Sequence, residues 1–388
     1  ALKINSKNVD ALINIGATLH KLERNSEALA SVQKAIRFNN KNSIAYHTLG
    51  SIYESEAKFN DAIESFKKAI LINPNDYESI HGLSLIQLSN KNYSAGWANY
   101  EARWLRGNMK FRYPDIKKLD SLKGIENKKI LIWHEQGFGD TIQFSRYVSL
   151  LIKLKAIVVF EVQQQLLSFL KDQIDCDVIE KAESKDFDFQ SPLLSVPKLF
   201  SIDGNDIPSS RPYFKCSRER YLYWKSLLFL SKEKINIGIA ISGNPNHYRE
   251  EKRRIHLESF LPLMKLCKIF IIQKELNQND LIFSEQNEEI IFLGKNKNWT
   301  DFKDTSAIVE NMDLIITIDT SLVHLAASMN KETILLLSKP SDWRWSENNK
   351  TLPNWYDSLT VIRQNEKNSW QYPLKEILRI LEKKTINI

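Results

Sequence analysis

Cysteine is scarce in this chain. Only Cys176, Cys216 and Cys267 occur among 388 residues, and none of them has the short spacing of a disulfide framework or a zinc site. Such usage is typical of a reducing compartment. The sequence also lacks an apolar run long enough to span a bilayer, and it shows no signal peptide. We therefore expect a cytoplasmic protein, which could lie peripherally at the inner face of the membrane.

Other absences narrow the function classes. No dense block of basic residues alternates with aromatic residues, so nucleic-acid binding is not predicted. No acidic pair with metal-ligand spacing accompanies the candidate nucleotide site described below, so we predict neither a metal nor a cofactor. The formal net charge of +7 would suit anionic ligands such as nucleotide diphosphates. The abundance of lysine and asparagine throughout the chain favours a general compositional bias instead.

Length and composition indicate an ordinary multidomain globular protein. Hydrophobic residues make up 43% of the chain and charged residues 26%, which is typical of globular domains. A chain of 388 residues exceeds one compact core, so we expect two or three domains.

An internal repeat occupies residues 1–106. Gly16 and Gly50 are 34 residues apart, which is the tetratricopeptide (TPR) period, and the apolar positions around them match in both units. A third, divergent copy runs through Gly96 and Tyr100. We predict a right-handed TPR α-solenoid that continues into the first sheet domain near Trp97–Trp104. Its groove could bind a protein partner, or the repeats could serve as a spacer or a dimerisation surface. The first residues fall in phase with a preceding unit, so we expect the chain to be a fragment.

After a polar connector at 107–127, strands and helices alternate in two series. This pattern predicts two Rossmann-like parallel-sheet domains, at 128–215 and 216–388, with ligands bound at the carboxyl ends of the strands. The final helix, 370–384, could pack back on the first of these domains. The predicted strands are 129–133, 157–162, 178–179, 192–196, 235–242, 268–273, 289–293, 314–318, 333–337 and 359–362, and the helices that follow the first two are 141–154 and 164–172.

The stretch DLIITIDTSLVHLAAS, 313–328, combines a buried strand with the start of a helix. Asp319 ends the strand, and Thr320 and Ser321 open the helix, so several backbone N–H groups point toward the sheet edge. A phosphate group could bind there. His324 projects from the same first turn. The alternative is that Asp319 or Thr320 only caps the helix and that His324 is a partly buried surface residue.

A second junction of this kind lies in ILIWHEQGFGDTIQFSRY, 130–147. Gly137 and Gly139 would allow a tight turn, and Asp140 stands at the start of the helix. The dinucleotide fingerprint is not matched, because Ile142 occupies its third small position. Asp140 could act as a general base for an attacking hydroxyl. The alternative is that Asp140 followed by Gln143 forms a capping box.

These residues carry a resemblance to a known family. The repeats and the segments EQGFGDTIQFSRY, PLLSVP, SGNPNH, DLIITIDTSLVHLA, DWRW and PNWYDS resemble the TPR-linked glycosyltransferases related to bacterial ADP-heptose heptosyltransferases. The resemblance implies a GT-B fold and an inverting, metal-independent transferase. It also implies that Asp140 is the general base, and that Asp319, Thr320, Ser321 and His324 face the donor diphosphate.

The resemblance implies further substrate-binding residues at both junctions and in the second domain. EEKRRIHL departs from the family pattern at Glu250, Arg254 and His256, so the resemblance does not specify the donor. The two tryptophans that flank Arg344 could instead be core packing around a stacked guanidinium. The implied substrate-binding residues, besides those named above, are Gln136, Gly137, Gly139, Ser242, Gly243, Asn244, His247, Arg253, Gln273, Lys274, Trp343 and Arg344.

We therefore predict a glycosyltransferase of hexosyl- or heptosyltransferase type. It would move a sugar from a nucleotide-sugar donor to a hydroxyl of a glycan, lipid or protein, with the TPR segment recruiting the acceptor or a partner. One alternative is a protein O-glycosyltransferase resembling O-GlcNAc transferase, which also joins TPR units to a GT-B pair. The other is a TPR adaptor whose GT-B domains bind ligand without catalysis.

Overall fold

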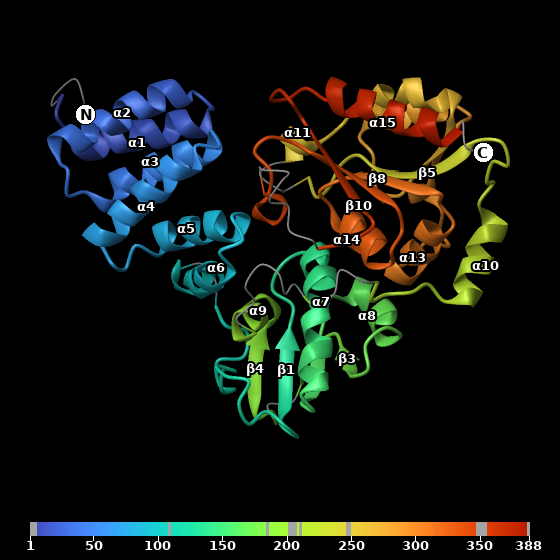
Figure 1. Ribbon diagram of the computed structural model, residues 1–388, viewed down its shortest axis with the longest axis horizontal. Helices are drawn as coiled ribbons and strands as arrows, with labels where there is room; N and C mark the ends of the chain where they lie inside the picture. Colours follow the sequence, from blue (N-terminus) through green and yellow to red (C-terminus); the bar gives the residue numbers. More distant parts are fainter. Residues whose placement is uncertain are drawn as a thin grey trace. The chain divides into compact units, whose positions relative to one another are not determined.

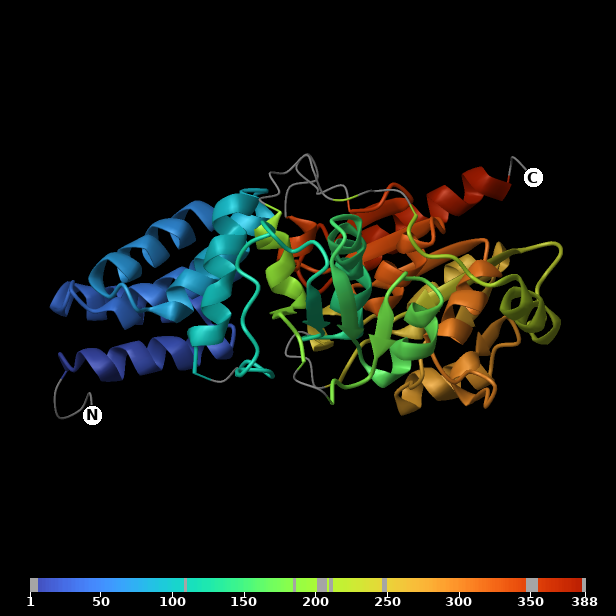
Figure 2. The ribbon, with the colours of Figure 1, turned by 90° about the horizontal axis from the view of Figure 1, so that it is seen from below.

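The structure, a computed structural model, describes residues 6–107, 110–183, 186–200, 208, 212–245, 250–346 and 355–385. The chain divides into two compact units. The helical unit consists of Ala1–Pro114, Pro197–Asp206 and Pro340–Pro353, and the sheet unit contains the remainder. Figures 1 and 2 show the ribbon from two directions.

The helical unit is built from pairs of antiparallel helices. In Figure 2 the helices coloured blue to cyan run side by side. Glycine allows each pair to approach closely: a Cβ atom at Gly16 would lie 2.4 Å from Val32 Cγ2, and one at Gly50 would lie 2.7 Å from the Phe66 ring. The predicted TPR solenoid is confirmed. Its elements are α1 (Val9–Lys21), α2 (Asn25–Phe38), α3 (Ser43–Ser55), α4 (Phe59–Ile72), α5 (Tyr77–Ser89), α6 (Tyr93–Tyr100) and the 3₁₀ helix η1 (Glu101–Leu105).

Acid should destabilise the helical unit through His81 on α5. Arg106 donates a hydrogen bond to Nδ1 of His81 at 2.9 Å, so this nitrogen must be unprotonated. Burial, followed by the charges of Arg106 and Arg103, lowers the pKa of His81 from 6.5 to about 4. The unfolded chain binds this proton below about pH 6.5, whereas the folded chain binds it only near pH 4. The stability that neutral His81 contributes is therefore present above pH 6.5 and lost as the pH falls toward 4.

We expect wild type to lose up to about 3 kcal/mol more unfolding free energy than His81→Gln between pH 7 and pH 4. Glutamine can still accept the hydrogen bond from Arg106 but does not titrate in this range. Chemical denaturation followed by circular dichroism measures the difference. Parallel losses in the two proteins would contradict a role for His81.

The first sheet of the sheet unit has four parallel strands in the order β3-β2-β1-β4. The strand predicted at 192–196 is wrong. The strand ends at Pro192, which has no N–H group to continue the ladder, and Leu193–Ser195 turn into a 3₁₀ helix. The elements are β1 (Lys129–Trp133), α7 (Phe138–Lys153), β2 (Ile157–Glu161), α8 (Gln164–Lys171), β3 (Asp177–Ile179), β4 (Phe189–Pro192) and η2 (Leu193–Ser195). The short helix α9 (Val196–Leu199) follows, and all but its first residue belong to the helical unit.

The second sheet has six parallel strands in the order β10-β9-β8-β5-β6-β7. The strands β5, β8 and β9 are buried along their whole length, which agrees with their mainly apolar sequences, whereas β10 is buried only at its last two residues. The elements are α10 (Arg218–Leu227), β5 (Ile235–Ala240), α11 (Glu250–Arg253), η3 (Leu257–Lys265), β6 (Cys267–Ile271), α12 (Gln278–Glu285), β7 (Ile290–Phe292), η4 (Leu293–Lys295), α13 (Phe302–Glu310), β8 (Leu314–Ile318), α14 (Ser321–Ser328), β9 (Thr333–Leu337), β10 (Leu359–Arg363) and α15 (Gln371–Thr385).

The strand orders identify where each sheet can bind a ligand. In the second sheet the chain moves outward from β5 in one direction and from β8 in the other, so a topological switch point lies between them. In the first sheet the corresponding point lies between β1 and β4. The candidate junctions follow β1, β5 and β8, which places them at these crevices.

The last helix, α15, packs on the second sheet. Ile377 and Leu381 join the same buried cluster as Ile334 and Ile362 of β9 and β10. A return of this helix to the first sheet was considered possible from the sequence, but its core contacts are with the second. Each predicted sheet domain, 128–215 and 216–388, contains one of the sheets, and their boundaries stay predictions. Among the described helices, none combines the length and apolarity needed to cross a membrane.

Candidate active site

The first junction is the start of α7 after β1. The helix begins at Phe138, three residues earlier than predicted, with Gly137 as its N-cap. Asp140 is therefore in the first turn, and its Oδ2 accepts a hydrogen bond from the Gly137 N–H at 3.0 Å. The capping box is formed by Gly137 and Asp140 rather than by Asp140 and Gln143, because the helix begins before Asp140, and Gln143 is buried within it. Gln136 is exposed, and its carbonyl accepts a hydrogen bond from Gln163 at 2.9 Å.

The second junction is the start of α14 after β8. Thr320 is the N-cap, and its hydroxyl accepts a hydrogen bond from the Leu322 N–H at 3.3 Å. The hydroxyl groups of Thr317 and Thr320 lie 3.2 Å apart. Asp319 and Ser321 are half-buried at the mouth of this turn. The predicted strand-to-helix junction is present, and the capping role of Thr320 is a fact of its geometry.

The two junctions meet at Gly139. A Cβ atom on Gly139 would lie 2.9 Å from Cδ2 and 3.5 Å from Nε2 of His324, and 3.5 Å from Cα of Ser321. Gly139 is in the first turn of α7, whereas Ser321 and His324 are in the first turn of α14. The glycine therefore leaves room for the imidazole of the other helix. Gly139 was expected to allow a tight turn, but its φ is not positive.

His324 is buried rather than partly exposed. Only 4% of its surface is accessible, and its Nδ1 lies 2.9 Å from the hydroxyl of Tyr356. Tyr356 is in the segment PNWYDS, which was recognised from the sequence without a role for this residue. The contact joins α14 to the segment before β10, and nothing in local periodicity could reveal it.

The loop after β5 is held by its neighbours. Gln273 Oε1 accepts hydrogen bonds from the N–H groups of Ile241 and Ser242, at 2.8 and 3.3 Å. Gln273 Nε2 donates to Ser242 Oγ at 2.7 Å and to the carbonyl of Glu275 at 2.6 Å. Gln273 thus fastens the loop to the end of β6. Asn244 is exposed, and His247 lies outside the described residues.

Arg253 links this loop to the second junction. Its Nη1 donates a hydrogen bond to the carbonyl of Asp319 at 2.8 Å, and its Nε donates to Glu250 at 2.7 Å. Glu250 also accepts a hydrogen bond from the Gly243 N–H at 2.7 Å. Glu250 was noted in the sequence only as a departure from the family pattern. It provides the buried carboxylate that orients Arg253.

Lys274 has partners of its own. Its ammonium group donates a hydrogen bond to the carbonyl of Trp299 and lies 4.0 Å from the centre of the Trp299 ring. Burial lowers the pKa of Lys274, and the nearby Asp301 acts in the opposite direction. The predicted contact of Lys274 or Arg253 with a diphosphate stays a prediction, since both side chains make structural contacts here.

Removing Arg253 should destabilise the sheet unit by about 2–3 kcal/mol, because Arg253→Ala leaves the buried Glu250 carboxylate without its cation. The double variant Arg253→Ala/Glu250→Gln should recover most of this loss. Lys274→Ala should cost less than about 1 kcal/mol, because its side chain lies at the surface. Denaturation curves measure all three. Equal losses in the single and double Arg253 variants would argue against the ion pair as the cause.

Trp343 and Arg344 lie in the helical unit. They belong to the 3₁₀ helix η5 (Trp343–Trp345), where both tryptophans and Arg344 are buried. The Trp343 ring packs edge-on against Trp97 with centroids 5.5 Å apart, and the Arg344 guanidinium lies 4.3 Å from the Trp343 ring centre. Arg344 also pairs with Asp342 at 2.9 Å. These contacts fit the core-packing alternative, and substrate binding by Trp343 and Arg344 stays a prediction.

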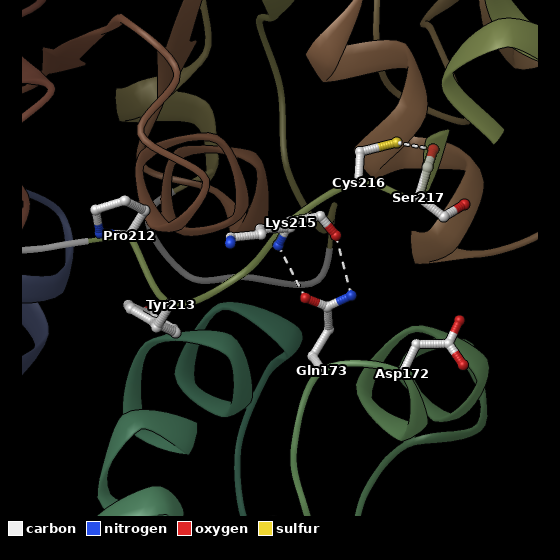
Figure 3. Close-up of a pocket in the computed structure, with 7 residues that line it drawn as sticks. All are labelled: Asp172, Gln173, Pro212, Tyr213, Lys215, Cys216 and Ser217. Carbon is white, nitrogen blue, oxygen red and sulfur yellow. Dashed lines mark hydrogen bonds between the residues drawn. The ribbon is translucent and has the colours of Figure 1, made fainter. Parts of the chain in front are cut away.

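A separate open pocket of about 450 Å³ lies elsewhere in the sheet unit, beside the end of α8. Figure 3 shows the Gln173 side chain pointing at the backbone of Lys215, with which it exchanges hydrogen bonds of 2.8 and 3.0 Å. None of the predicted site residues lines this pocket. Within the described part of the chain, no group of three or more His, Cys, Asp or Glu side chains could hold a metal ion.

Two known protein families match parts of the chain. Residues 9–42 and 44–76 match the tetratricopeptide repeat family. Residues 280–376, which include β8, α14 and Tyr356, match glycosyltransferase family 9 (heptosyltransferase). The chain carries tetratricopeptide repeats and a glycosyltransferase family 9 domain. The predicted class of enzyme, a glycosyltransferase, is thereby confirmed at the level of the family.

Solved structures with a similar fold include both kinds of protein. The Escherichia coli ADP-heptose lipopolysaccharide heptosyltransferase II is 16% identical, with a TM-score of 0.48 over 66% of this chain and 99% of its own. A family 9 glycosyl transferase from Veillonella parvula is 14% identical, with a TM-score of 0.48 over 67% of this chain and 90% of its own.

The MamA protein is 24% identical, with a TM-score of 0.25 over 27% of this chain, and the chain spans 57% of its length. The search of curated proteins found no match. Similarities of this size carry no argument about substrates. The repeats followed by parallel sheets nevertheless agree with the predicted TPR and GT-B-like architecture.

Proposed function

We propose that the glycosyltransferase family 9 domain acts together with α7 to transfer a sugar from a nucleotide-diphosphate donor to an acceptor hydroxyl. One observation carries the proposal: the first turns of α7 and α14 meet, with Gly139 against Ser321 and His324. Each helix start offers backbone N–H groups and the positive end of a helix dipole. Such a place suits the diphosphate of a nucleotide sugar.

The chemistry that we propose needs no metal. As the bond from the sugar to the diphosphate breaks, negative charge grows on the leaving group and positive charge grows on the anomeric carbon. The N–H groups at the start of α14 and the imidazole of His324 would stabilise the diphosphate. Asp140 would take the proton of the acceptor hydroxyl as its oxygen attacks from the opposite face, which inverts the configuration. Arg253 would support the diphosphate site by holding the Asp319 carbonyl.

We further propose that the TPR helices recruit the acceptor or a partner protein. Large apolar side chains are exposed on these helices and could contact an extended segment, namely Ile15, Leu22, Phe38, Ile44 and Leu71. The TPR unit would then determine which acceptor reaches the site. Glycan, lipid and protein acceptors all present hydroxyl groups that this chemistry could use.

Calorimetric titration with ADP, GDP and UDP tests the proposed donor site. We expect one of them to bind with the same affinity in Mg²⁺ and in EDTA, because protein N–H groups replace the metal. A loss of affinity on chelation would contradict the metal-free site. Failure of all three to bind would contradict the nucleotide-sugar proposal itself.

Nucleotide sugars of the base that binds then test turnover. Release of the nucleoside diphosphate, with product formed on a saccharide, lipid or polypeptide acceptor, would identify the acceptor class. Product on polypeptide alone would favour the protein O-glycosyltransferase alternative. Tight binding with no release in any mixture would favour the non-catalytic adaptor and would contradict the enzyme that we propose.

A further inference from the structure

A buried polar cluster surrounds the far side of His324. Tyr356 contacts Nδ1 of His324 at 2.9 Å, and the Arg146 guanidinium lies 4.9 Å from the centre of the Tyr356 ring. Tyr356 is 6% exposed and Arg146 is 4% exposed. Tyr213 completes the cluster, because Arg146 Nη2 donates a hydrogen bond to its hydroxyl at 3.1 Å. None of these three residues had a role in the proposed reaction.

Arg146 fixes the cluster to α7. Its Nε donates a hydrogen bond to the carbonyl of Gln143 within α7 at 2.9 Å, and its Nη1 donates to the carbonyl of Trp355 at 3.1 Å. The Trp355 residue immediately precedes Tyr356. A guanidinium on α7 therefore holds the backbone that presents the Tyr356 hydroxyl to His324.

The direction of the hydrogen bond between Tyr356 and His324 follows from which neighbouring groups can donate and which can accept. The Tyr356 hydroxyl also interacts with Arg146, which can only donate, and with Tyr213. The Tyr213 hydroxyl donates its own hydrogen bond to the carbonyl of Ile142, at 3.1 Å, so it cannot also donate to Tyr356. Burial raises the pKa of Tyr356, so its phenol stays protonated. An imidazole nitrogen is a better acceptor than a phenol oxygen that already accepts from a cation, so the Tyr356 proton points to Nδ1.

We propose that Tyr356 is a positioning residue: it donates a hydrogen bond to Nδ1 of His324 and thereby fixes the neutral imidazole with its proton on Nε2. The Nε2 edge of the ring faces Gly139, where the two helix starts meet. The Nε2–H group of His324 then donates a hydrogen bond to the diphosphate. The inference rests on the proposed function for this last step, whereas the tautomer itself does not depend on it.

The wild-type protein gives a direct test through ring signals of isotopically labelled histidine. Two-bond ¹H–¹⁵N correlations distinguish an unprotonated Nδ1 from a protonated one, and a spectrum of His324→Gln identifies His324 among the seven histidines. We expect the Nε2–H tautomer in wild type at pH 7. A protonated Nδ1 would overturn the proposal, and this outcome requires no Tyr356 variant to fold.

The variant Tyr356→Phe removes only the hydroxyl. We expect His324 to populate both tautomers and the affinity for the nucleoside diphosphate that binds wild type to fall three- to tenfold. Tyr93→Phe removes a buried phenol hydroxyl in α6 of the helical unit and should change neither measurement. Unchanged ring signals in Tyr356→Phe would refute the positioning role. If the tautomer changes as expected but no nucleoside diphosphate binds wild type, the positioning stands and the proposed function fails.

Discussion

Replacing Asp140 by asparagine should lower turnover about a hundredfold or more, the usual scale for the loss of a general base. Asparagine is nearly isosteric with aspartate, and its amide oxygen can still accept the hydrogen bond from the Gly137 N–H. Neither amide atom can take a proton from an acceptor hydroxyl at neutral pH. Steady-state kinetics with saturating donor would measure the loss, and calorimetry should find nearly unchanged donor affinity.

This substitution is informative because Asp140 also has a capping role: its carboxylate accepts a hydrogen bond from the N–H of the N-cap residue Gly137. A residue that only caps would give an active asparagine variant. The charge of Asp140 also interacts with the helix dipole, so Asp140→Asn should cost less than about 1 kcal/mol and little in melting temperature. Asp140→Ala loses the cap bond as well, and should cost about 1 kcal/mol. If the asparagine variant kept full turnover, catalysis by Asp140 would be excluded and the fold would be unaffected.

Local patterns in the sequence were enough to predict the architecture. The TPR period repeats because every unit needs a small residue where its paired helices touch, as Gly16 and Gly50 do against Val32 and Phe66. The strands of the second sheet were predicted within two residues because most of their residues are apolar and the central strands are buried on both faces. The prediction of a strand at 192–196 was wrong. The sequence PLLSV is apolar enough for a buried strand, but Pro192 ends the ladder of backbone hydrogen bonds.

The side-chain partners of the site could not be predicted, because they come from distant parts of the chain. Arg146 contacts the carbonyl of Trp355 across 209 residues, and Arg253 contacts that of Asp319 across 66. The family resemblance implied that Arg253 and Lys274 bind the donor. The folded chain pairs Arg253 with Glu250, and it places Lys274 on Trp299. Only the backbone junctions, which follow from local sequence, were foreseen.

A methyl group on Gly139 should weaken binding of the nucleoside diphosphate about tenfold or more, equivalent to about 1.4 kcal/mol. The Cβ atom of Gly139→Ala would lie 2.9 Å from the His324 ring, which is too close for both groups to keep their places. Tyr356 holds the ring on its other side, so the imidazole must leave that hydrogen bond or the two helix starts must separate. Alanine also favours a helix over glycine by up to about 1 kcal/mol, so the loss should appear in affinity and turnover rather than in melting temperature.

A double-mutant cycle with His324→Ala shows whether the imidazole is the cause. When the ring is absent, Gly139→Ala should change the affinity by less than about twofold, because the clash with the ring is gone and Cα of Ser321 lies at an ordinary 3.5 Å. Gly137→Ala is the matched control in the same turn: its methyl group would lie 3.5 Å from the Asp140 carboxylate, so the His324 ring signals should not move. Equal effects of Gly139→Ala with and without His324 would mean that the glycine is required by the backbone conformation of α7 rather than by the imidazole. A coupling energy of about 1 kcal/mol or more between the two substitutions would show that Gly139 is needed to leave room for the His324 ring.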